Sequence, residues 1–590
     1  MSVLRLGRWG VASLMVGLAA CGSDEGGAVN ASAGSAGSSA QGGGKSAGAA
    51  NLGEDAGSAG ESDADAGSAG EQEAEGGSAG TQSSVGGSAG TSGTNGGSAG
   101  TSGSAGTSGG TAGSTGTSGS GGAGGSAGGS GGVFRQWLAF TNSTGTFVYD
   151  PAKFPLDSGV VSLNSDAARS LLWSPDGRWL LYWVGSELYC RDMSAAVPGS
   201  PLLLISGLSQ YLSPHVTPLT WSADSKTVGV ASVPVASSTD PQTVFQVLDP
   251  TRAAPPISTL SNSVQTVAWA PTGERVLFAP LLFSNSTAHV RSVTAGVPGA
   301  DVTLNGATFA WSADGKSVAN VVVGSGPTVT GLILTDVSQA TPSPVTIPTN
   351  PTVAAPSVAR IAFSPDGSAL LFSGAQLREG AYDLFRVPLK PTVGAPVLVS
   401  TGLTGTVSVS SFAWSPDGKW ATYTVYGVAS GTSPNWAVDM SGASPGTPFQ
   451  PGAIPGSSSS WLVSAPQKFL ASYNSDYLLV DLSNPSATPT TIFSGSVSAA
   501  AMNPLSSILA FGVTSHLYLR DLEHLENPAT DFPISAASPS SLRWSPNGQF
   551  LSFVLSGQLR LARADGMTLS TALTLSSISS SAPSPSWQPQ

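Results

Sequence analysis

The chain has 590 residues and a net charge of −12, and only 10% of its residues are charged, against roughly 25% in an ordinary soluble protein. Serine, threonine, glycine and asparagine supply much of its polarity instead. An acidic chain with a pI near 4.7 and no cluster of lysine or arginine repels a phosphate backbone, so the composition argues against DNA and RNA as partners.

The N-terminal segment is typical of an export signal. Arg5 and Arg8 precede an apolar run from Trp9 to Ala20, which has the length of a signal-peptide core and is too short to span a bilayer. We therefore interpret residues 1–20 as a signal peptide and predict that the chain is exported.

The end of this run, Leu18-Ala19-Ala20-Cys21, resembles the lipobox of bacterial lipoproteins. The resemblance implies that the Cys21 thiol receives diacylglycerol and that acyl chains anchor the mature protein, each buried methylene contributing about 0.8 kcal/mol. In that family an aspartate after the cysteine retains the protein at the inner membrane. Gly22 stands here, so the resemblance implies the outer membrane, on its periplasmic side or at the cell surface. The alternative is an ordinary cysteine beside a cleaved signal.

Residues 21–132 have the composition of a disordered, Gly/Ser-rich tether. Glycine, serine, alanine and threonine dominate, and a ten-residue period is visible in AGSAGESDAD and AGSAGEQEAE. Without aromatic residues, burial cannot offset the roughly 1–2 kcal/mol per residue that ordering a backbone costs. A coil of this length reaches about 60 Å, which suits a spacer. GGSAG matches the G-x-S-x-G pattern of esterases, but that motif requires a strand that turns into a helix.

A Trp-Ser-Pro-Asp-Gly motif recurs every 41 to 52 residues between residues 133 and 590. Clear copies begin at Trp173, Trp221, Trp269, Trp311, Phe363, Trp414 and Trp544, and weaker ones at Trp461 and Met502. This spacing is the length of one four-stranded propeller blade. Ser-Pro-Asp-Gly suits a type I turn, and the alternating stretches beside it indicate strands. We expect the aromatic residue before each turn to pack between neighbouring blades.

The two ends of the repeat region complement each other. The chain stops just past Trp587, where a blade would have only its first strand, whereas the stretches from Trp137 and Gly145 look like second and third strands without a first. Joining them gives ten units and leaves no exposed sheet edge where the ring closes. The predicted fold is all-β, one large propeller ring of about 8–10 four-stranded blades closed by the N- and C-terminal strands. Merged units near Trp461 and Met502, or two rings, are the alternatives.

The repeats resemble those of TolB-like propellers, which also occur in tricorn and prolyl-oligopeptidase-type peptidases. The resemblance covers roughly residues 134–590 and implies the fold rather than a function. TolB itself carries an α/β domain before its propeller, where this chain has the tether. The motif is not the Asp-box of sialidases, because Gly177 directly follows Asp176.

Histidine and cysteine offer little for catalysis or metal binding. The four histidines, His215, His289, His516 and His524, lack metal-ligand spacing. His524 and Glu523 could border a ligand site, but we favour solvated turn residues. Alternation places Cys190 on a strand beside Tyr189, where a buried, inert thiol is expected.

The repeated aspartates Asp176, Asp314, Asp366 and Asp417 could be mistaken for calcium ligands. One falls in each blade turn, far from the next around a ring, so turn capping is the favoured role. A separate α/β-hydrolase domain, which the related peptidases need, has no room in this chain. We therefore predict no catalytic residue, no metal site and no cofactor.

Two classes of function remain. The favoured one is a cell-envelope lipoprotein, anchored in the membrane through Cys21, whose propeller is a non-enzymatic scaffold for a protein or glycan partner. The alternative is a propeller enzyme, a lyase or glycoside hydrolase with its site in the central channel. Such a site needs converging carboxylates, histidines or metal ligands, and the low charge and scarce histidine argue against it.

Overall fold

The computed structural model describes residues 135–589, except for 208–216, 234–242, 281–286, 307, 324–329, 340, 349–356, 429–432, 452–458, 463, 474–475, 485, 535–536 and 580–581. The described residues fall in one compact unit. The proposed signal peptide, the tether, Cys21 and His215 lie outside them. No helix in the described part of the chain has the length and apolar character needed to cross a membrane.

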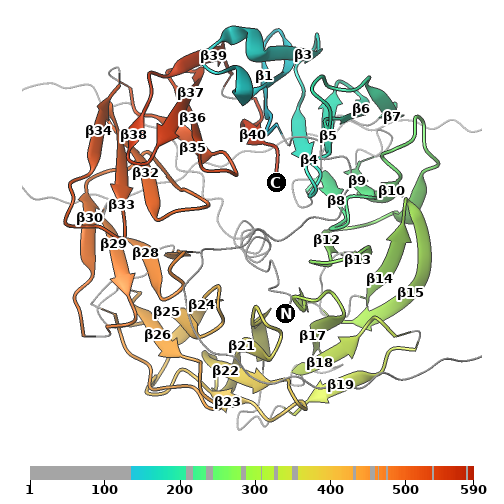
Figure 1. Ribbon diagram of the computed structural model, residues 1–590. Coiled ribbons are helices and arrows are strands. Elements are labelled where there is room, and N and C mark those ends of the chain that lie inside the picture. Colours follow the sequence, from blue (N-terminus) through green and yellow to red (C-terminus); the bar gives the residue numbers. More distant parts are fainter. Residues whose placement is uncertain are drawn as a thin grey trace, which may run out of the picture. The chain divides into compact units, whose positions relative to one another are not determined.

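Ten antiparallel sheets follow one another around a ring, which we number as blades 1 to 10 (Figure 1). Blade 1 contains β4 (Ser170–Trp173), β5 (Trp179–Val184), β6 (Glu187–Asp192) and β7 (Leu202–Ile205). Blade 2 contains β8 (Leu219–Trp221), β9 (Val228–Ser232), β10 (Val244–Leu248) and β11 (Ser258–Ser261). Blade 3 contains β12 (Thr266–Trp269), β13 (Arg275–Ala279), β14 (Thr287–Thr294) and β15 (Val297–Asn305). Blade 4 contains β16 (Thr308–Trp311), β17 (Ser317–Val323), β18 (Thr330–Asp336) and β19 (Pro344–Ile347). Blade 5 contains β20 (Ser357–Phe363), β21 (Ala369–Arg378), β22 (Ala381–Pro388) and β23 (Val397–Leu398).

The second half of the ring is built in the same way. Blade 6 contains β24 (Ser408–Trp414), β25 (Trp420–Tyr426) and β26 (Asn435–Asp439). Blade 7 contains β27 (Ser459–Trp461), β28 (Lys468–Tyr473), β29 (Asp476–Asp481) and β30 (Thr490–Ser494). Blade 8 contains β31 (Ala499–Met502), β32 (Ile508–Val513), β33 (His516–Asp521) and β34 (Thr530–Pro533). Blade 9 contains β35 (Ser540–Trp544), β36 (Phe550–Leu555), β37 (Gln558–Asp565), β38 (Thr568–Leu569) and β39 (Leu573–Ser577). Blade 10 contains β40 (Ser586–Trp587), β1 (Leu138–Asn142), β2 (Gly145–Tyr149) and β3 (Val160–Asn164).

The prediction of a β-propeller is confirmed, and the blade number lies at the upper end of the expected range. The weak repeats at Trp461 and Met502 do not merge but form blades 7 and 8. Blade 6 differs from the expected four strands, because only the bridge from Ala437 to Phe449 extends its three-stranded sheet. Pro448 and Pro451 flank Phe449, and proline cannot donate to a ladder, which explains why a full fourth strand is missing.

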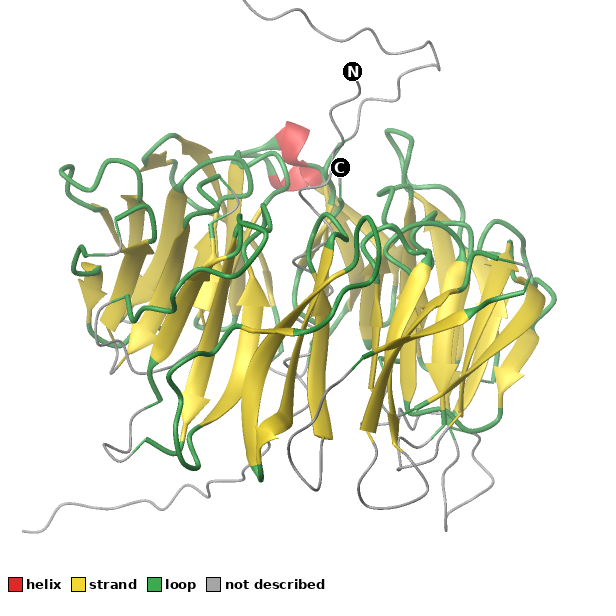
Figure 2. Ribbon diagram, turned by 90° about the horizontal axis from the view of Figure 1, so that it is seen from below, coloured by secondary structure: helices red, strands yellow, loops and turns green. Residues whose placement is uncertain are grey.

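The connections between strands divide between two faces of the ring. We call the side with the turns from first to second strands and the connections from third to fourth strands the turn face, and the opposite side the loop face. The two short 3₁₀ helices, η1 (Pro151–Lys153) and η2 (Asp157–Gly159), join β2 to β3 and so lie on the turn face (Figure 2). The first strands, such as β4, β8 and β12, lie nearest the centre of the ring (Figure 1).

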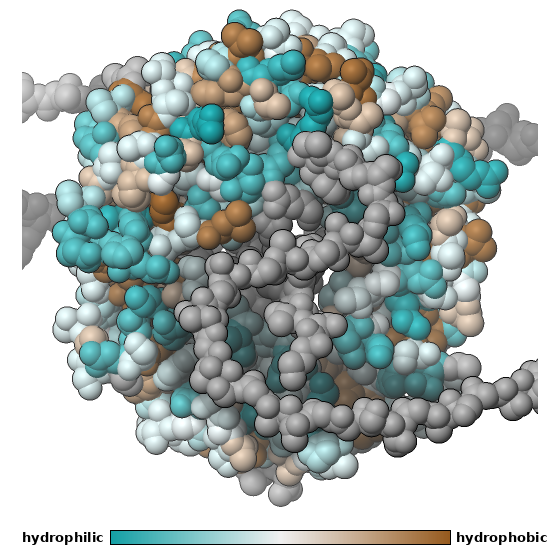
Figure 3. All heavy atoms as spheres, in the orientation of Figure 1, coloured by the Kyte–Doolittle hydropathy of each residue, from teal (hydrophilic) through white to brown (hydrophobic). Residues whose placement is uncertain are grey.

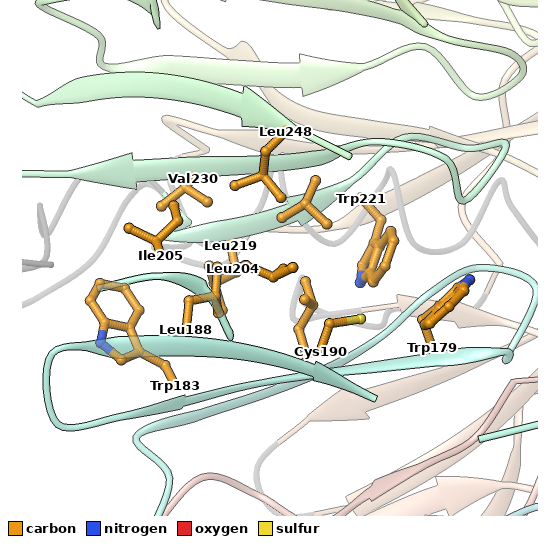
Figure 4. Packing of buried hydrophobic residues seen from close by; sticks show 12 residues of the cluster. Trp179, Trp183, Leu188, Cys190, Leu204, Ile205, Leu219, Trp221, Val230 and Leu248 are labelled. Atoms are coloured by element: carbon orange, nitrogen blue, oxygen red, sulfur yellow. The ribbon is translucent and has the colours of Figure 1, made fainter. Parts of the chain in front are cut away.

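Apolar side chains fill the boundaries between blades. At the boundary of blades 1 and 2, Trp179, Leu181 and Trp183 of β5 pack in one buried cluster with Trp221 and Val230 of blade 2 (Figure 4). The expectation that the repeated tryptophan packs between blades is therefore confirmed. Because the strands alternate, one face of each sheet serves one boundary and the other face serves the next.

The repeated tryptophans also make a polar contact that the sequence did not reveal. The indole N–H of Trp173 donates to the Ser586 carbonyl of the preceding blade at 3.1 Å, and that of Trp221 donates to the Leu172 carbonyl at 3.5 Å. Trp311, Trp414, Trp544 and Trp587 make the same bond to a carbonyl of the preceding first strand, and Trp269 donates instead to the Thr220 hydroxyl of that strand at 3.0 Å. We call this contact the indole bond.

The C-terminal residues close the ring, as predicted. Strand β40 pairs with β1 through Leu138 opposite Trp587 and Ala139 opposite Ser586. Gln588 reinforces this pairing: it exchanges bonds of 2.8 and 3.0 Å with Trp137 and donates its side-chain amide to the Gly177 carbonyl in blade 1 at 2.6 Å. The last strand of the chain therefore ties blade 10 to both of its neighbours.

Deleting residues 584–590 should lower the free energy of unfolding by about 3–5 kcal/mol, because it removes a buried tryptophan and the Gln588 bonds. It should also promote association through the exposed edge of β1. Thermal unfolding and light scattering measure the two effects. Deleting residues 101–107 is the matched control and should change neither; equal behaviour of both deletions would contradict closure by β40.

Candidate functional site

The predicted turn-capping role of the repeated aspartates matches their geometry. In blade 6, the Ser415 hydroxyl donates to Asp417 Oδ1 at 2.6 Å, and the same oxygen accepts the Lys419 N–H at 3.1 Å. Gly418 has a φ of +70°, a conformation that favours glycine. Aspartates in the same position make the same two bonds in blades 1, 2, 4 and 5: Asp176, Asp224, Asp314 and Asp366.

A second repeated aspartate lies at the end of the third strand and was missed in the sequence. Asp192 Oδ1 accepts the Ser194 N–H at 2.9 Å and the Ser194 hydroxyl at 2.6 Å. The pattern Asp-x-Ser/Thr recurs with the same pair of bonds at Asp249, Asp336, Asp439 and Asp481. The turn face thus carries two sets of carboxylates, and both sets are committed to turns.

The described histidines each contact one carboxylate. His289 Nδ1 lies 2.8 Å from Asp301, and His516 Nδ1 lies 2.8 Å from Asp531. His524 is exposed, and its Nδ1 lies 2.8 Å from Asp521. The hydrogen bond that the protonated ring donates to Asp521 raises the His524 pKa, as expected for an ion pair on a solvated turn.

Cys190 is buried in the boundary of blades 1 and 2 (Figure 4). Burial raises the pKa of its thiol, so the thiolate, which is the reactive form, is disfavoured. The position on a strand and the burial agree with the expectation of an inert thiol. Within the described ranges, no group of three or more His, Cys, Asp or Glu side chains could hold a metal ion.

The first strands of the blades, which lie nearest the centre of the ring, carry mostly uncharged side chains. Their sequences include SLLW, LTW, TVAW, TFAW and AAAM. Among the first strands, Arg360 in β20 and Arg543 in β35 are the charged residues, and both are exposed. They belong to blades 5 and 9, so they do not form one cluster. The converging carboxylates of a channel enzyme are not found on these strands.

The surface of the ring is largely polar. Hydrophilic residues cover much of the face seen in Figure 3, and hydrophobic ones are interspersed among them. The most exposed large apolar side chains in the described part of the chain include Val197, Val297, Leu505 and Leu156, and they come from different blades. Scattered apolar residues of this kind do not mark a binding patch.

No protein-family model matches the chain, and no curated protein matches it. Solved structures do. A eukaryotic initiation factor shares 13% identity over 77% of this chain and 98% of that chain, with a TM-score of 0.43. The C-terminal WD40 domain of Sif2 shares 14% over 68% and 97%, with a TM-score of 0.33, and the dihydro-heme d1 dehydrogenase NirN shares 16% over 64% and 82%, with a TM-score of 0.35. At these identities the similarity concerns the fold alone.

Replacing Asp366 with alanine should lower the free energy of unfolding by about 1 kcal/mol, because Oδ1 accepts bonds from Ser364 and Ser368. Asp366→Asn should retain most of the stability, since Asn547 makes the same bonds in blade 9. Thermal unfolding measures both variants. Added calcium should leave the wild-type curve unchanged, and a calcium-dependent rise in melting temperature would contradict turn capping.

The same variants should differ in their response to pH. Partial burial acts to raise the Asp366 pKa, but the hydrogen bonds from Ser364 and Ser368 outweigh it and lower the pKa below its ordinary value. The stabilisation by the carboxylate is therefore complete above the ordinary aspartate pKa of about 3.9 and is lost as the pH falls through the lowered value. Asp366→Asn should lack this part of the acid-induced loss.

Proposed function

We propose that the chain is a cell-envelope lipoprotein whose TolB-like propeller is a non-enzymatic scaffold for a protein or glycan partner. The observation that carries the proposal is the uneven length of the connections on the loop face. Second and third strands are joined by two residues in six blades, but by residues 233–243 in blade 2, 280–286 in blade 3, 324–329 in blade 4 and 427–434 in blade 6. Loops of this kind on a rigid frame are where binding residues concentrate.

Three of the four longer connections belong to the adjacent blades 2 to 4, and we therefore propose the binding region there. On the turn face, by contrast, the turns from first to second strands repeat one short Ser-x-Asp-Gly pattern in blades 1, 4, 5 and 6 and offer little variation on which selectivity could depend. The three connections of blades 2 to 4 read VPVASSTDPQT, PLLFSNS and GSGPTV and contain one charged residue, Asp240. Hydroxyl, amide and apolar groups in this mixture suit an uncharged glycan or a neutral protein surface better than a phosphate.

The first strands support a scaffold rather than an enzyme. A lyase or glycoside hydrolase requires carboxylates that converge within a few ångströms of one bond. The charged side chains on the first strands are two arginines in separate blades. The lipobox-like Cys21 and the tether of about 110 residues would let the propeller search a region of about 60 Å around its anchor.

The loops can be tested one at a time in the full chain. Replacing residues 233–243 or 280–286 with Asn-Gly, which forms a two-residue hairpin, should abolish retention of the partner on the immobilised chain. The probes are solubilised envelope proteins and purified envelope polysaccharide. The matched control replaces Gly185-Ser186, the two-residue connection of blade 1, with Asn-Gly and should retain binding. Unchanged binding by both loop variants, or cleavage of the polysaccharide by the wild-type chain, would overturn the proposal.

The anchor has its own test. A fatty-acid analogue supplied to growing cells should label the wild-type protein and not Cys21→Ala, because the thiol is the acceptor in the lipobox resemblance. The variant should also move from the membrane fraction to the soluble fraction. Equal labelling of both proteins would contradict the proposed lipid anchor at Cys21 and would leave the proposed binding region unaffected.

A further inference from the structure

Backbone hydrogen-bond ladders hold each blade together, but none of them crosses from one blade to the next. The strands of each sheet pair only within that sheet. Apolar side chains, the indole bonds and other side-chain hydrogen bonds, such as those from Arg386 to the Gly442 carbonyl and from Asn503 to the Gly548 carbonyl, therefore hold the boundaries. A boundary can open without breaking a single ladder, so the weakest boundary determines where the ring comes apart.

Blade 7 is the one blade that lacks the indole bond at both of its boundaries. At the boundary with blade 8, Met502 replaces the tryptophan and has no N–H to donate. At the boundary with blade 6, Trp461 is present, but its buried Nε1 has no hydrogen-bond partner among the described residues. Phe363 removes the bond between blades 4 and 5, yet blade 4 keeps the bond of Trp311 on its other side.

The boundary of blades 6 and 7 also has a small apolar core. Among the described residues, its cluster contains five buried ones, of which Ala437 and Ala471 are alanines, whereas the cluster between blades 1 and 2 contains twelve. Partly buried aromatic residues, Trp420, Phe449 and Trp461, border this smaller cluster.

Polar residues take the place of apolar ones at this boundary. Trp183 pairs with Leu188 across β5 and β6 in blade 1, and both are buried against blade 2 (Figure 4). The equivalent pair in blade 6 is Thr424 and Asn435, which lie on the same side of their strands as Trp420 and Ala437. Their side chains bond each other at 2.6 Å. Asn435 is 3% exposed, and its Nδ2 has no partner among the described residues.

The closing strand is the obvious rival as a point of opening, because β40 pairs with β1 through only two residue pairs. Side chains reinforce it, however. The Trp587 indole lies 3.4 Å from the Arg543 carbonyl and 3.1 Å from the Ser552 hydroxyl, and Gln588 bonds to Trp137 and Gly177. The closing strand therefore has side-chain hydrogen bonds to its neighbours, whereas the described residues make none across the boundary of blades 6 and 7.

We propose that the ring opens at the boundary between blades 6 and 7. The opening separates two intact blades and gives access to the centre of the ring from its side. The other nine boundaries stay closed, so blades 7 to 10 and 1 to 6 move as one open arc.

Hydrogen–deuterium exchange of the full chain tests this. The second strands are the fair comparison, because each lies inside its blade and is paired on both sides. Opening leaves these ladders intact, so their amides exchange when a blade that has lost the packing of its neighbour then unfolds locally. Amides of β25 and β28 should exchange at least about tenfold faster than those of β5 and β9, a difference readily resolved by mass spectrometry. The double variant Thr424→Val/Asn435→Leu replaces both partners of the polar pair with apolar groups and should slow exchange in β25 and β28 by about tenfold. Exchange in β5 and β9 should not change.

A pair of conservative variants provides the control for the indole bond. Trp311→Phe removes a bond of 3.1 Å to Ala268 and should accelerate exchange in β13 and β17. Trp461→Phe removes a donor without a described partner and should leave exchange in β25 and β28 unchanged. If the double variant does not fold, the comparison of Trp311→Phe with Trp461→Phe still tests the proposal. Fastest exchange in β1 or at another boundary, uniform exchange around the ring, or acceleration by Trp461→Phe equal to that by Trp311→Phe would each overturn the proposal.

Discussion

The packing of side chains between blades is the interaction on which the ring depends. Each sheet satisfies its own backbone, so a blade gains nothing from its neighbour through hydrogen-bond ladders. It gains burial instead, and a fully buried tryptophan accounts for about 3–5 kcal/mol, a large share of the stability of an ordinary domain. The repeated tryptophan adds direction to this burial, because its N–H bonds to one particular carbonyl of the preceding strand.

This arrangement separates the parts of the molecule that hold it together from those that are free to vary. Tryptophan, the capped turn and the Asp-x-Ser/Thr turn repeat on the turn face, where each satisfies its own polar groups. The connections between second and third strands carry no such task. They can lengthen in blades 2 to 4 without disturbing a boundary, and for that reason we place the binding region there.

The sequence predicted what depends on local pattern and missed what depends on opposing sheets. The period of the tryptophan motif predicted ten units, and Trp587 together with the strands after Trp137 predicted the closure. Gln588 gave no signal, because its partners lie 451 and 411 residues away. Thr424 stands in an ordinary alternating strand, and only the structure places it with Asn435 against a neighbouring blade. The Asp-x-Ser/Thr pattern was visible in the sequence and could have been found.

The strand that completes blade 10, β40, is made after the other described strands of the propeller, whereas its partner β1 is made before them. Until Ser586 and Trp587 have been made, the edge of β1 has no strand to pair with, however well the intervening blades have formed. An open arc with a free β edge is prone to pair with other chains. Synthesis therefore exposes this protein to misassembly for the time it takes to make almost the whole propeller.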